Sequence, residues 1–337
     1  MSREKLNQLG IDLPLFPTTT VGSLPKPAYL VKARAEFGKQ KISRASLEKY
    51  EKQATEFWMR TQDDLGIDVL VDGQMARGDA VAYFAEQMDG FEMERAGDSS
   101  RKGHSVKPVI TAEVRARRPM TVDGWRFAQG LTRRPVKAVL TGPYTLMDES
   151  VNEHYADRRA ACLALAREIR RETEALVEAG AKIIQLDEPA VSRRPEELAL
   201  GIEAMHVVTD GLPVYFIAHL CRGPYEKIYP DMLRIPVDNF DVETSTDGLE
   251  VLGLFGKSSY TKDLSFGVVD VQSPRVEDPQ VIEKRLRQAL DVLPRASLWV
   301  DPDCGLGTRS VDEAVGKLSA MVTAARSLRK SGNPSFF

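Results

Sequence analysis

The chain has 337 residues, of which 42% are hydrophobic and 28% charged, as in a globular protein with one large domain or two medium ones. The net charge of −3 argues against a nucleic-acid partner. The polar N-terminus MSREKLNQLG is no signal peptide, no apolar run could span a membrane, and three scattered cysteines make no disulfide framework. We therefore expect a cytoplasmic protein with reduced thiols and neither nucleic acid nor membrane as a partner.

Short apolar segments alternate with longer amphipathic ones along the chain. Helical spacing of apolar residues is clearest over 158–180 and 279–294. Strands between such helices predict a parallel sheet, and eight of these units fit a (β/α)8 barrel of the TIM type. The predicted strands are 18–23, 67–73, 136–142, 182–188, 214–220, 239–244, 264–271 and 297–303.

The domain prediction is a single α/β barrel over residues 17–331. It follows a leader segment (1–16) and precedes a frayed tail (332–337). A further strand at 107–114 is expected outside the barrel, within an insertion at about residues 90–125. The chain contains no internal repeat and no low-complexity linker that would suggest another boundary.

Polar side chains follow many of the predicted strands. In a barrel, the C-terminal ends of all strands converge on one pocket, whereas in an open sheet they lie along an edge. This pattern therefore favours the barrel and predicts a site at that end. The residues concerned are Ser23, Gln74, Asp187, His219, Glu243, Gln272 and Cys304.

Four of the residues at or near these strand ends could bind a metal. His219 and Cys221 stand two positions apart, the spacing that directs two side chains of a strand to one side. With Glu243 and Cys304 they offer nitrogen, sulfur and oxygen atoms, the ligand types that zinc accepts. Cys162 lies within a predicted helix and is interpreted as core. Hydrogen bonding of the histidine and hydrophobic packing of the cysteines are the alternatives.

Several motifs resemble the C-terminal catalytic barrel of the cobalamin-independent methionine synthases. HLC (219–221), ETS (243–245) and PDCGLGTR (302–309) are similar to that family's zinc motifs, with similar spacing. FPTTTVGSLPKP, VLVDGQMARGD, VKAVLTGPYT and IIQLDEPA resemble further blocks in the same order. The resemblance extends from about Phe16 to the last helix and is closest to the short "core" methionine synthases.

The resemblance implies a zinc methyltransferase in which His219, Cys221, Glu243 and Cys304 hold the metal. The substrate would be L-homocysteine, whose thiol becomes a nucleophile on zinc and is methylated to give L-methionine.

The resemblance also implies contacts to the amino-acid end of homocysteine. Val21, Gly22 and Ser23 would hold the carboxylate, and Asp187 would accept from the ammonium group. Gln74 stands where the family has a glutamate, so it brings no charge to the same region.

Positions that match the family's folate contacts differ in this chain. Glu149 replaces a stacking tryptophan, Arg193 a glutamate, and His104-Ser105 an Arg-Cys pair. Gln272 replaces the histidine that protonates the leaving folate, and glutamine is no general acid. We therefore expect methylcobalamin or a methylated corrinoid protein as the methyl donor.

Four alternatives remain open on the sequence. The first is a methionine synthase that depends on methyltetrahydrofolate, and the second is a zinc alkyltransferase for another thiol. A third is a metal-free enzyme on a related barrel, such as a decarboxylase, which leaves Cys304 without a role. The last is a binding module with a structural zinc, which predicts a closed metal site.

Overall fold

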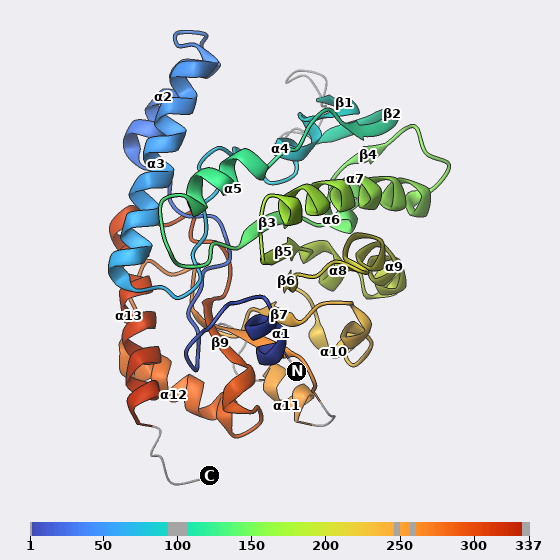
Figure 1. The fold of residues 1–337 in the computed structure, drawn as a ribbon. Coiled ribbons are helices and arrows are strands. Elements are labelled where there is room, and N and C mark those ends of the chain that lie inside the picture. The colour runs from blue at the N-terminus through green and yellow to red at the C-terminus, as the bar shows by residue number, and fades with distance from the viewer. Residues whose placement is uncertain (1, 94–106, 246–249, 257–259, 332–337) are drawn as a thin grey trace. The chain divides into compact units, whose positions relative to one another are not determined.

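The computed structural model describes residues 2–93, 107–245, 250–256 and 260–331 (Figure 1). Contacts within the chain define two compact units. Unit 1 comprises Met1–Ala76, Gly124–Lys137 and Asp238–Phe337, and unit 2 comprises Arg77–Asp123 and Ala138–Val237. The single domain over 17–331 stays a prediction. The predicted tail and part of the predicted insertion (94–106) lie outside the described residues.

Unit 2 contains three parallel strands with buried residues almost throughout. They are β3 (Ala138–Thr141), β5 (Ile183–Asp187) and β6 (Tyr215–Leu220), and each was predicted from its short apolar run. Thr141 pairs with Asp187, and Asp187 pairs with His219, so these polar residues are in register at the C-terminal ends.

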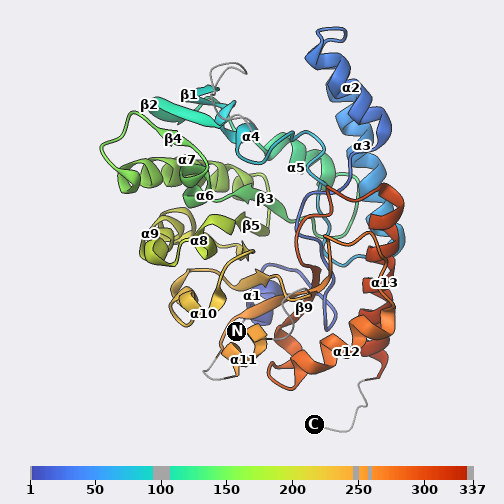
Figure 2. The same ribbon diagram turned by 180° about the vertical axis from the view of Figure 1, so that it is seen from behind.

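Helices pack around these strands. The predicted helix 158–180 is α7 (Arg158–Glu178). Asp157 caps its N-terminus, because the Asp157 side chain accepts from Ala160 N–H. α7 packs on α6 (Pro143–Asp148) and on α9 (Leu198–Thr209), as both views show (Figures 1 and 2). The other helices of unit 2 are α4 (Ala82–Ala85), α8 (Pro189–Arg193), α10 (Tyr225–Ile228), η1 (Pro195–Glu197) and η2 (Asp231–Arg234).

A small second sheet in unit 2 contains the strand predicted outside the barrel. That strand is β2 (Pro108–Ala116), which pairs antiparallel with β1 (Met88–Met93) and parallel with β4 (Val151–Asn152). Its burial pattern is mixed, because only one face of β2 is covered, in part by α7. The strand predicted at 107–114 therefore exists as β2 and belongs to a sheet other than the one formed by the parallel strands.

Unit 1 contains the other parallel strands. They are β7 (Asn239–Val242), β8 (Asp263–Val269) and β9 (Leu298–Pro302), again close to their predicted positions. α12 (Pro279–Leu290) and α13 (Val311–Lys330) pack together, both contact β8, and α13 also contacts β9 (Figure 1). The other helices are α1 (Ser2–Gln8), α2 (Ala28–Gly38), α3 (Arg44–Leu65), α11 (Glu250–Phe255), η3 (Arg295–Ser297) and most of α5 (Val122–Gln129).

Two predicted strands, 18–23 and 67–73, are reduced to isolated parallel bridges. Thr18 pairs with Val300, and Leu70 with Val136. A side chain adds to the backbone bonds between the two segments: Val69 N–H donates to Thr18 O at 3.0 Å, and the Thr19 hydroxyl donates to Val69 O at 2.9 Å. Apolar patterning identified these segments as buried, but it could not reveal that their pairing ends after one bridge.

No helix among the residues that the structure describes is long and apolar enough to cross a membrane. The cytoplasmic location stays a prediction.

Candidate metal and substrate site

The end of β6 presents two of the predicted ligands in unit 2. His219 and Cys221 are 3% and 4% exposed. The turn after them is fixed, because the Ser192 hydroxyl donates to Cys221 O at 2.8 Å. A Cβ at Gly223 would lie 2.3 Å from Ser192 Cβ, so glycine is required where this turn meets α8. The sequence HLCRG thus holds imidazole and thiol in a buried, closely packed turn.

Glu188 supports the same turn and was missed by the sequence analysis. Its backbone N–H donates to His219 O at 2.9 Å. Its carboxylate accepts from the N–H groups of Tyr144 and Thr145 at 3.0 and 2.8 Å, at the start of α6. Burial raises the pKa of Glu188 to about 7, although these hydrogen bonds act in the opposite direction. Two adjacent acids in LDEPA were the available signal.

Asp187 ends β5 and is half-buried. Its Oδ1 accepts from Gln185 Nε2 at 2.7 Å. This contact orients the carboxylate from within its own strand. Asp187 is therefore a fixed anion at the C-terminal end of the unit 2 strands, as a partner for an ammonium group has to be.

Glu243 and Cys304 follow β7 and β9 in unit 1, and both are half-buried. Asp303, immediately before Cys304, is fully buried and accepts from the backbone N–H groups of Thr244 and Ser245 at 3.0 and 2.9 Å. Burial raises the pKa of Asp303 to about 6, and the nearby Glu243 charge adds to this rise. The two predicted ligands of unit 1 are therefore carried by loops that are bonded to each other.

The predicted carboxylate-binding segment lies against the Cys304 loop. Leu306 N–H donates to Ser23 O at 2.8 Å. A Cβ at Gly305 would lie 2.0 Å from Ser23 Oγ, which explains the glycine after Cys304. Val21 and Gly22 are buried and Ser23 is half-buried, in a loop that bends at Gly22 rather than in a strand.

Gln74 lies on the neighbouring loop of unit 1. Leu24 N–H donates to Gly73 O at 3.1 Å, which joins this loop to the Ser23 segment. Gln74 is 8% exposed and has a left-handed φ of 58°, a conformation that costs a residue with a side chain some strain. Its N–H donates to Asp72 Oδ1 at 2.9 Å. Within unit 1, the structure thus brings the Ser23, Gln74 and Cys304 loops together.

Gln272 is exposed on the loop after β8. Its N–H donates to Asp270 Oδ1 at 2.7 Å. Buried Lys317 fixes the same loop, since its Nζ donates to Asp270 O at 2.9 Å and to Glu277 at 3.0 Å. No sequence pattern indicated Lys317, because a lysine in an amphipathic helix is ordinarily exposed.

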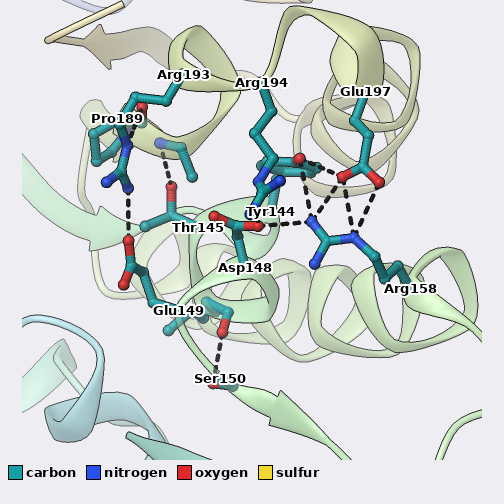
Figure 3. A network of polar contacts seen from close by, with 12 residues as sticks. Tyr144, Thr145, Asp148, Glu149, Ser150, Arg158, Pro189, Arg193, Arg194 and Glu197 are labelled. Carbon is teal, nitrogen blue, oxygen red and sulfur yellow. Dashed lines mark hydrogen bonds and ion pairs between the residues drawn. The ribbon is translucent and has the colours of Figure 1, made fainter. Parts of the chain in front are cut away.

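Ion pairs join the helices that follow β3 and β5 (Figure 3). Arg158 bonds Asp148 and Glu197, each at 2.7 Å, and lowers the pKa of Glu197. Arg193 donates to Glu149 at 2.6 Å. Two residues that depart from the family's pattern, Glu149 and Arg193, therefore bind each other.

The described residues contain a group of potential metal ligands: His219, Cys221 and Cys304. Glu243 is not part of the group, and neither is Cys162, which is fully buried in α7 as expected of a core residue. One imidazole and two thiols are ligand types that suit a soft or borderline transition metal, so the protein belongs to the class of candidate metalloproteins. Sites of this kind at the ends of parallel strands are typical of α/β enzymes of the TIM-barrel type.

The chain belongs to the family described as cobalamin-independent synthase, catalytic domain, whose model matches residues 16–327. This confirms the family that the motifs resemble. The solved B12-independent methionine synthase from Shewanella sp. W3-18-1, in complex with selenomethionine, is 25% identical, covers 94% of this chain and 98% of its own, and has a TM-score of 0.83. A putative counterpart from Listeria monocytogenes is 21% identical, with a TM-score of 0.78 over 94% of this chain and 99% of its own. The TIM-barrel type of fold is thereby confirmed.

Curated relatives are more similar in sequence. The 5-methyltetrahydropteroyltriglutamate–homocysteine methyltransferase of Chelativorans sp. (strain BNC1) is 37% identical over 97% of this chain and 44% of its own length. The enzyme of the same name from Pasteurella multocida is 37% identical over 96% of this chain and 44% of its own. The chain thus spans about half the length of the curated relatives that it matches.

The prediction of methylcobalamin or a methylated corrinoid protein as donor is wrong. The relatives are named for a methylated folate, and the solved neighbour is a B12-independent enzyme. The prediction gave too much weight to single side chains. Gln272 is exposed on a loop, Arg193 is exposed at the end of α8, and Glu149 is half-buried. Substitutions at such positions are tolerated far more readily than changes in a core, so they did not outweigh similarity along the whole chain.

Proposed function

We propose that the protein transfers a methyl group to the thiol of L-homocysteine, giving L-methionine, with zinc as the metal and a methylated folate as the donor. The observation that carries the proposal is the ligand group His219, Cys221 and Cys304 in a chain 37% identical to homocysteine methyltransferases. The folate comes from the names of those relatives, which specify 5-methyltetrahydropteroyltriglutamate.

The ligand types support zinc. Imidazole nitrogen, thiolate sulfur and carboxylate oxygen all bind it well, and we propose Glu243 as the fourth ligand beside His219, Cys221 and Cys304. When bound, zinc makes a thiol more acidic, which matters because a free thiol has a pKa of about 8.5 and is mostly protonated at neutral pH. Burial of His219 and Cys221 excludes water from part of the ligand set.

Protein groups orient the amino-acid end of homocysteine in this proposal. The Val21–Ser23 loop offers backbone and hydroxyl donors to the carboxylate. Asp187, oriented by Gln185, accepts from the ammonium group. Gln74 adds a neutral hydrogen-bonding group from a strained, buried turn. Fixing both ends of the substrate limits its motion and aligns its sulfur with the donor methyl group.

The donor nitrogen that loses its methyl group has to gain a proton. Gln272 cannot supply that proton, because an amide is not a general acid. Gln272 is exposed, however, so water reaches this loop. We propose water as the proton source.

The proposal is tested with purified, zinc-loaded protein, L-homocysteine and 5-methyltetrahydropteroyltriglutamate in a corrinoid-free buffer. Methionine formation, followed by mass spectrometry, is the expected result. Replacing the folate by methylcobalamin gives the comparison of donors. Failure to form methionine from any methylated folate would contradict the proposed function.

The acceptor is tested in the same assay. Gln74 lacks the charge that the family's glutamate would bring, which leaves open a thiol without an amino group. We expect homocysteine to react faster than 2-mercaptoethanesulfonate because Asp187 has no partner on the latter. The reverse order would favour a different thiol acceptor.

A further inference from the structure

Asp303 joins the two loops of unit 1 that carry proposed zinc ligands. It follows β9, is fully buried and directly precedes Cys304. Its Oδ1 accepts from Thr244 N–H at 3.0 Å and from Ser245 N–H at 2.9 Å, and its Oδ2 accepts from the Ser245 hydroxyl. Thr244 is the residue after Glu243. The Asp303 carboxylate therefore bonds the backbone directly after Glu243, while Asp303 itself directly precedes Cys304.

The surrounding strand ends leave Asp303 little freedom. Asp303 N–H donates to Val269 O of β8 at 3.1 Å. A Cβ at Gly267 would lie 2.5 Å from Asp303 Oδ1 and 2.9 Å from Val242 O, so the missing side chain of Gly267 makes room for the carboxylate. The Thr244 hydroxyl also donates to Gly267 O. Asp303 is thus held by β8 and by the loop that follows β7.

A second side chain holds the Glu243 loop from outside. Arg285 of α12 donates to Ser245 O at 3.1 Å and to Val268 O at 3.3 Å. These bonds fix the loop against β8 but do not reach the Cys304 loop. Among the described contacts, the bonds of Asp303 connect the two ligand loops directly.

A fully buried carboxylate is costly unless hydrogen bonds compensate for lost solvation. Three donors from a single dipeptide, Thr244-Ser245, provide part of that compensation for Asp303. Hydrogen bonds to a charged group are stronger than neutral ones. The arrangement is accordingly rigid, and rigidity before metal binding lowers the entropy lost when ligands are ordered.

We propose that Asp303 is a positioning residue that preorganises Glu243 and Cys304 for metal binding. Asp303 is not itself a ligand in this proposal and does not touch the substrate. The inference rests on the proposed function, because it assumes that both neighbours bind zinc. Its physical basis is the bonding of the Glu243 loop to the Cys304 loop within unit 1.

The first experiment needs no metal. Amide hydrogen exchange is measured in metal-free wild-type protein and in Asp303→Ala and Asp303→Asn. The N–H groups of Thr244 and Ser245 should exchange at least about tenfold faster in Asp303→Ala, since their acceptor is gone. Asp303→Asn keeps an oxygen acceptor and should retain most of the protection. Unchanged exchange in Asp303→Ala would overturn the inference.

The second experiment measures zinc affinity by competition with a chromophoric chelator. We expect Asp303→Ala to bind zinc at least about tenfold more weakly, the equivalent of roughly 1.4 kcal/mol. Asp303→Asn should lose less, and Ser245→Ala, which removes one donor, should lie between wild type and Asp303→Ala. The thiolate-to-metal absorption band of the cobalt-substituted protein should weaken in the same order.

Asp68→Ala is the matched control for general destabilisation. Asp68 also accepts hydrogen bonds from a backbone N–H and a hydroxyl, both of Thr18 and both at 2.8 Å. Unlike Asp303, it lies near the N-terminal end of its buried segment, 67–73, and is not adjacent to a proposed zinc ligand. Asp68→Ala should lower unfolding stability without changing zinc affinity. Equal losses of zinc affinity in Asp68→Ala and Asp303→Ala would refute a positioning role. A wild-type protein that binds no zinc would instead contradict the proposed function, while the exchange experiment would still test the contact.

Discussion

At the scale of single residues, the three cysteines have different surroundings. Cys221 is buried at the end of β6, Cys304 is half-buried after β9, and Cys162 is enclosed within α7. Burial raises the pKa of the Cys162 thiol, which keeps it protonated and a poor ligand. Exposure alone does not distinguish the proposed ligand Cys221 from Cys162, because both are buried. Their positions in the fold do, since Cys221 follows a strand and Cys162 lies within a helix.

This difference gives a test of the metal ligands. Cys221→Ser and Cys304→Ser should each remove most of the bound zinc, because a hydroxyl is a much weaker zinc ligand than a thiolate. Cys162→Ser should keep about one zinc per chain. Metal content is measured by inductively coupled plasma mass spectrometry on folded protein. Equal zinc loss in all three variants would contradict the assignment.

Asp187 allows substrate binding to be separated from metal binding. Asp187→Asn should raise the KM for homocysteine by roughly 10- to 100-fold, since a hydrogen bond to a charged group contributes about 1.5–3 kcal/mol. Zinc content should stay unchanged. The KM for a thiol without an amino group serves as the control and should not respond. Zinc loss in this variant would make Asp187 part of the metal shell.

At the scale of elements, the loop after β8 depends on one side chain of α13. Lys317 is fully buried and bonds Asp270 O, Arg275 O and the Glu277 carboxylate. All three of its N–H donors are thus used. The conformation of the Gln272 loop is consequently coupled to the packing of α13.

Removing this lysine should destabilise the fold. Lys317→Met is expected to lower the free energy of unfolding by on the order of 3 kcal/mol, because it leaves buried acceptors without a donor. The matched control is Lys284→Met on α12, where the side chain is exposed and the change should stay within about 0.5 kcal/mol. Urea denaturation measures both. Similar values for the two variants would contradict the role of Lys317.

Glu51 on α3 makes stability depend on pH. It is 4% exposed and pairs with Arg34 at 3.1 Å and Arg44 at 2.8 Å. Burial nevertheless raises its pKa above the ordinary 4.5, outweighing both arginines. The folded state therefore holds this proton more tightly than the unfolded state, and stability falls as the pH rises from about 4.5 through the raised pKa.

Glu51→Gln should abolish that contribution. The stability of the wild type relative to Glu51→Gln should decrease as the pH is raised from about 4.5 toward neutrality. Chemical denaturation at a series of pH values provides the measurement. A difference that is constant with pH would show that the pKa of Glu51 is not raised.

At the scale of the whole molecule, metal and fold should be linked. A ligand that binds only the folded state stabilises it, by about 2.7 kcal/mol at a concentration 100 times Kd. Removing zinc with a chelator should therefore lower Tm in the wild type and in Cys162→Ser. Cys304→Ser should show no shift between zinc and chelator. If the Tm of the wild type is the same with zinc and with chelator, the folded protein does not bind the metal.

Much of the fold was predictable because its signals are local. Six parallel strands and the helices α7 and α12 lie close to their predicted positions, since apolar periodicity reports which residues are buried. The strands at 18–23 and 67–73 were overpredicted. Their residues are buried, but their pairing depends on partners such as Val300 and Val136, which periodicity does not identify.

The sequence by itself determined the family and the candidate metal ligands. HLC, ETS and PDCGLGTR are short, ordered motifs that offer the ligand types of zinc, and their resemblance to the family's zinc motifs is what favoured a metal over the alternatives. The match of the family model over residues 16–327 confirms that such motifs suffice to recognise the family.

Only the tertiary structure revealed the groups that hold the site in shape. Asp303 bonds residues 58 and 59 positions away, and Glu188 bonds residues 43 and 44 positions away. Lys317 reaches 40 to 47 positions back along the chain. Such contacts depend on which strands become neighbours, and no local pattern encodes that. The candidate ligands were therefore visible in the sequence, whereas the buried charges that support their loops became visible only once the chain had folded.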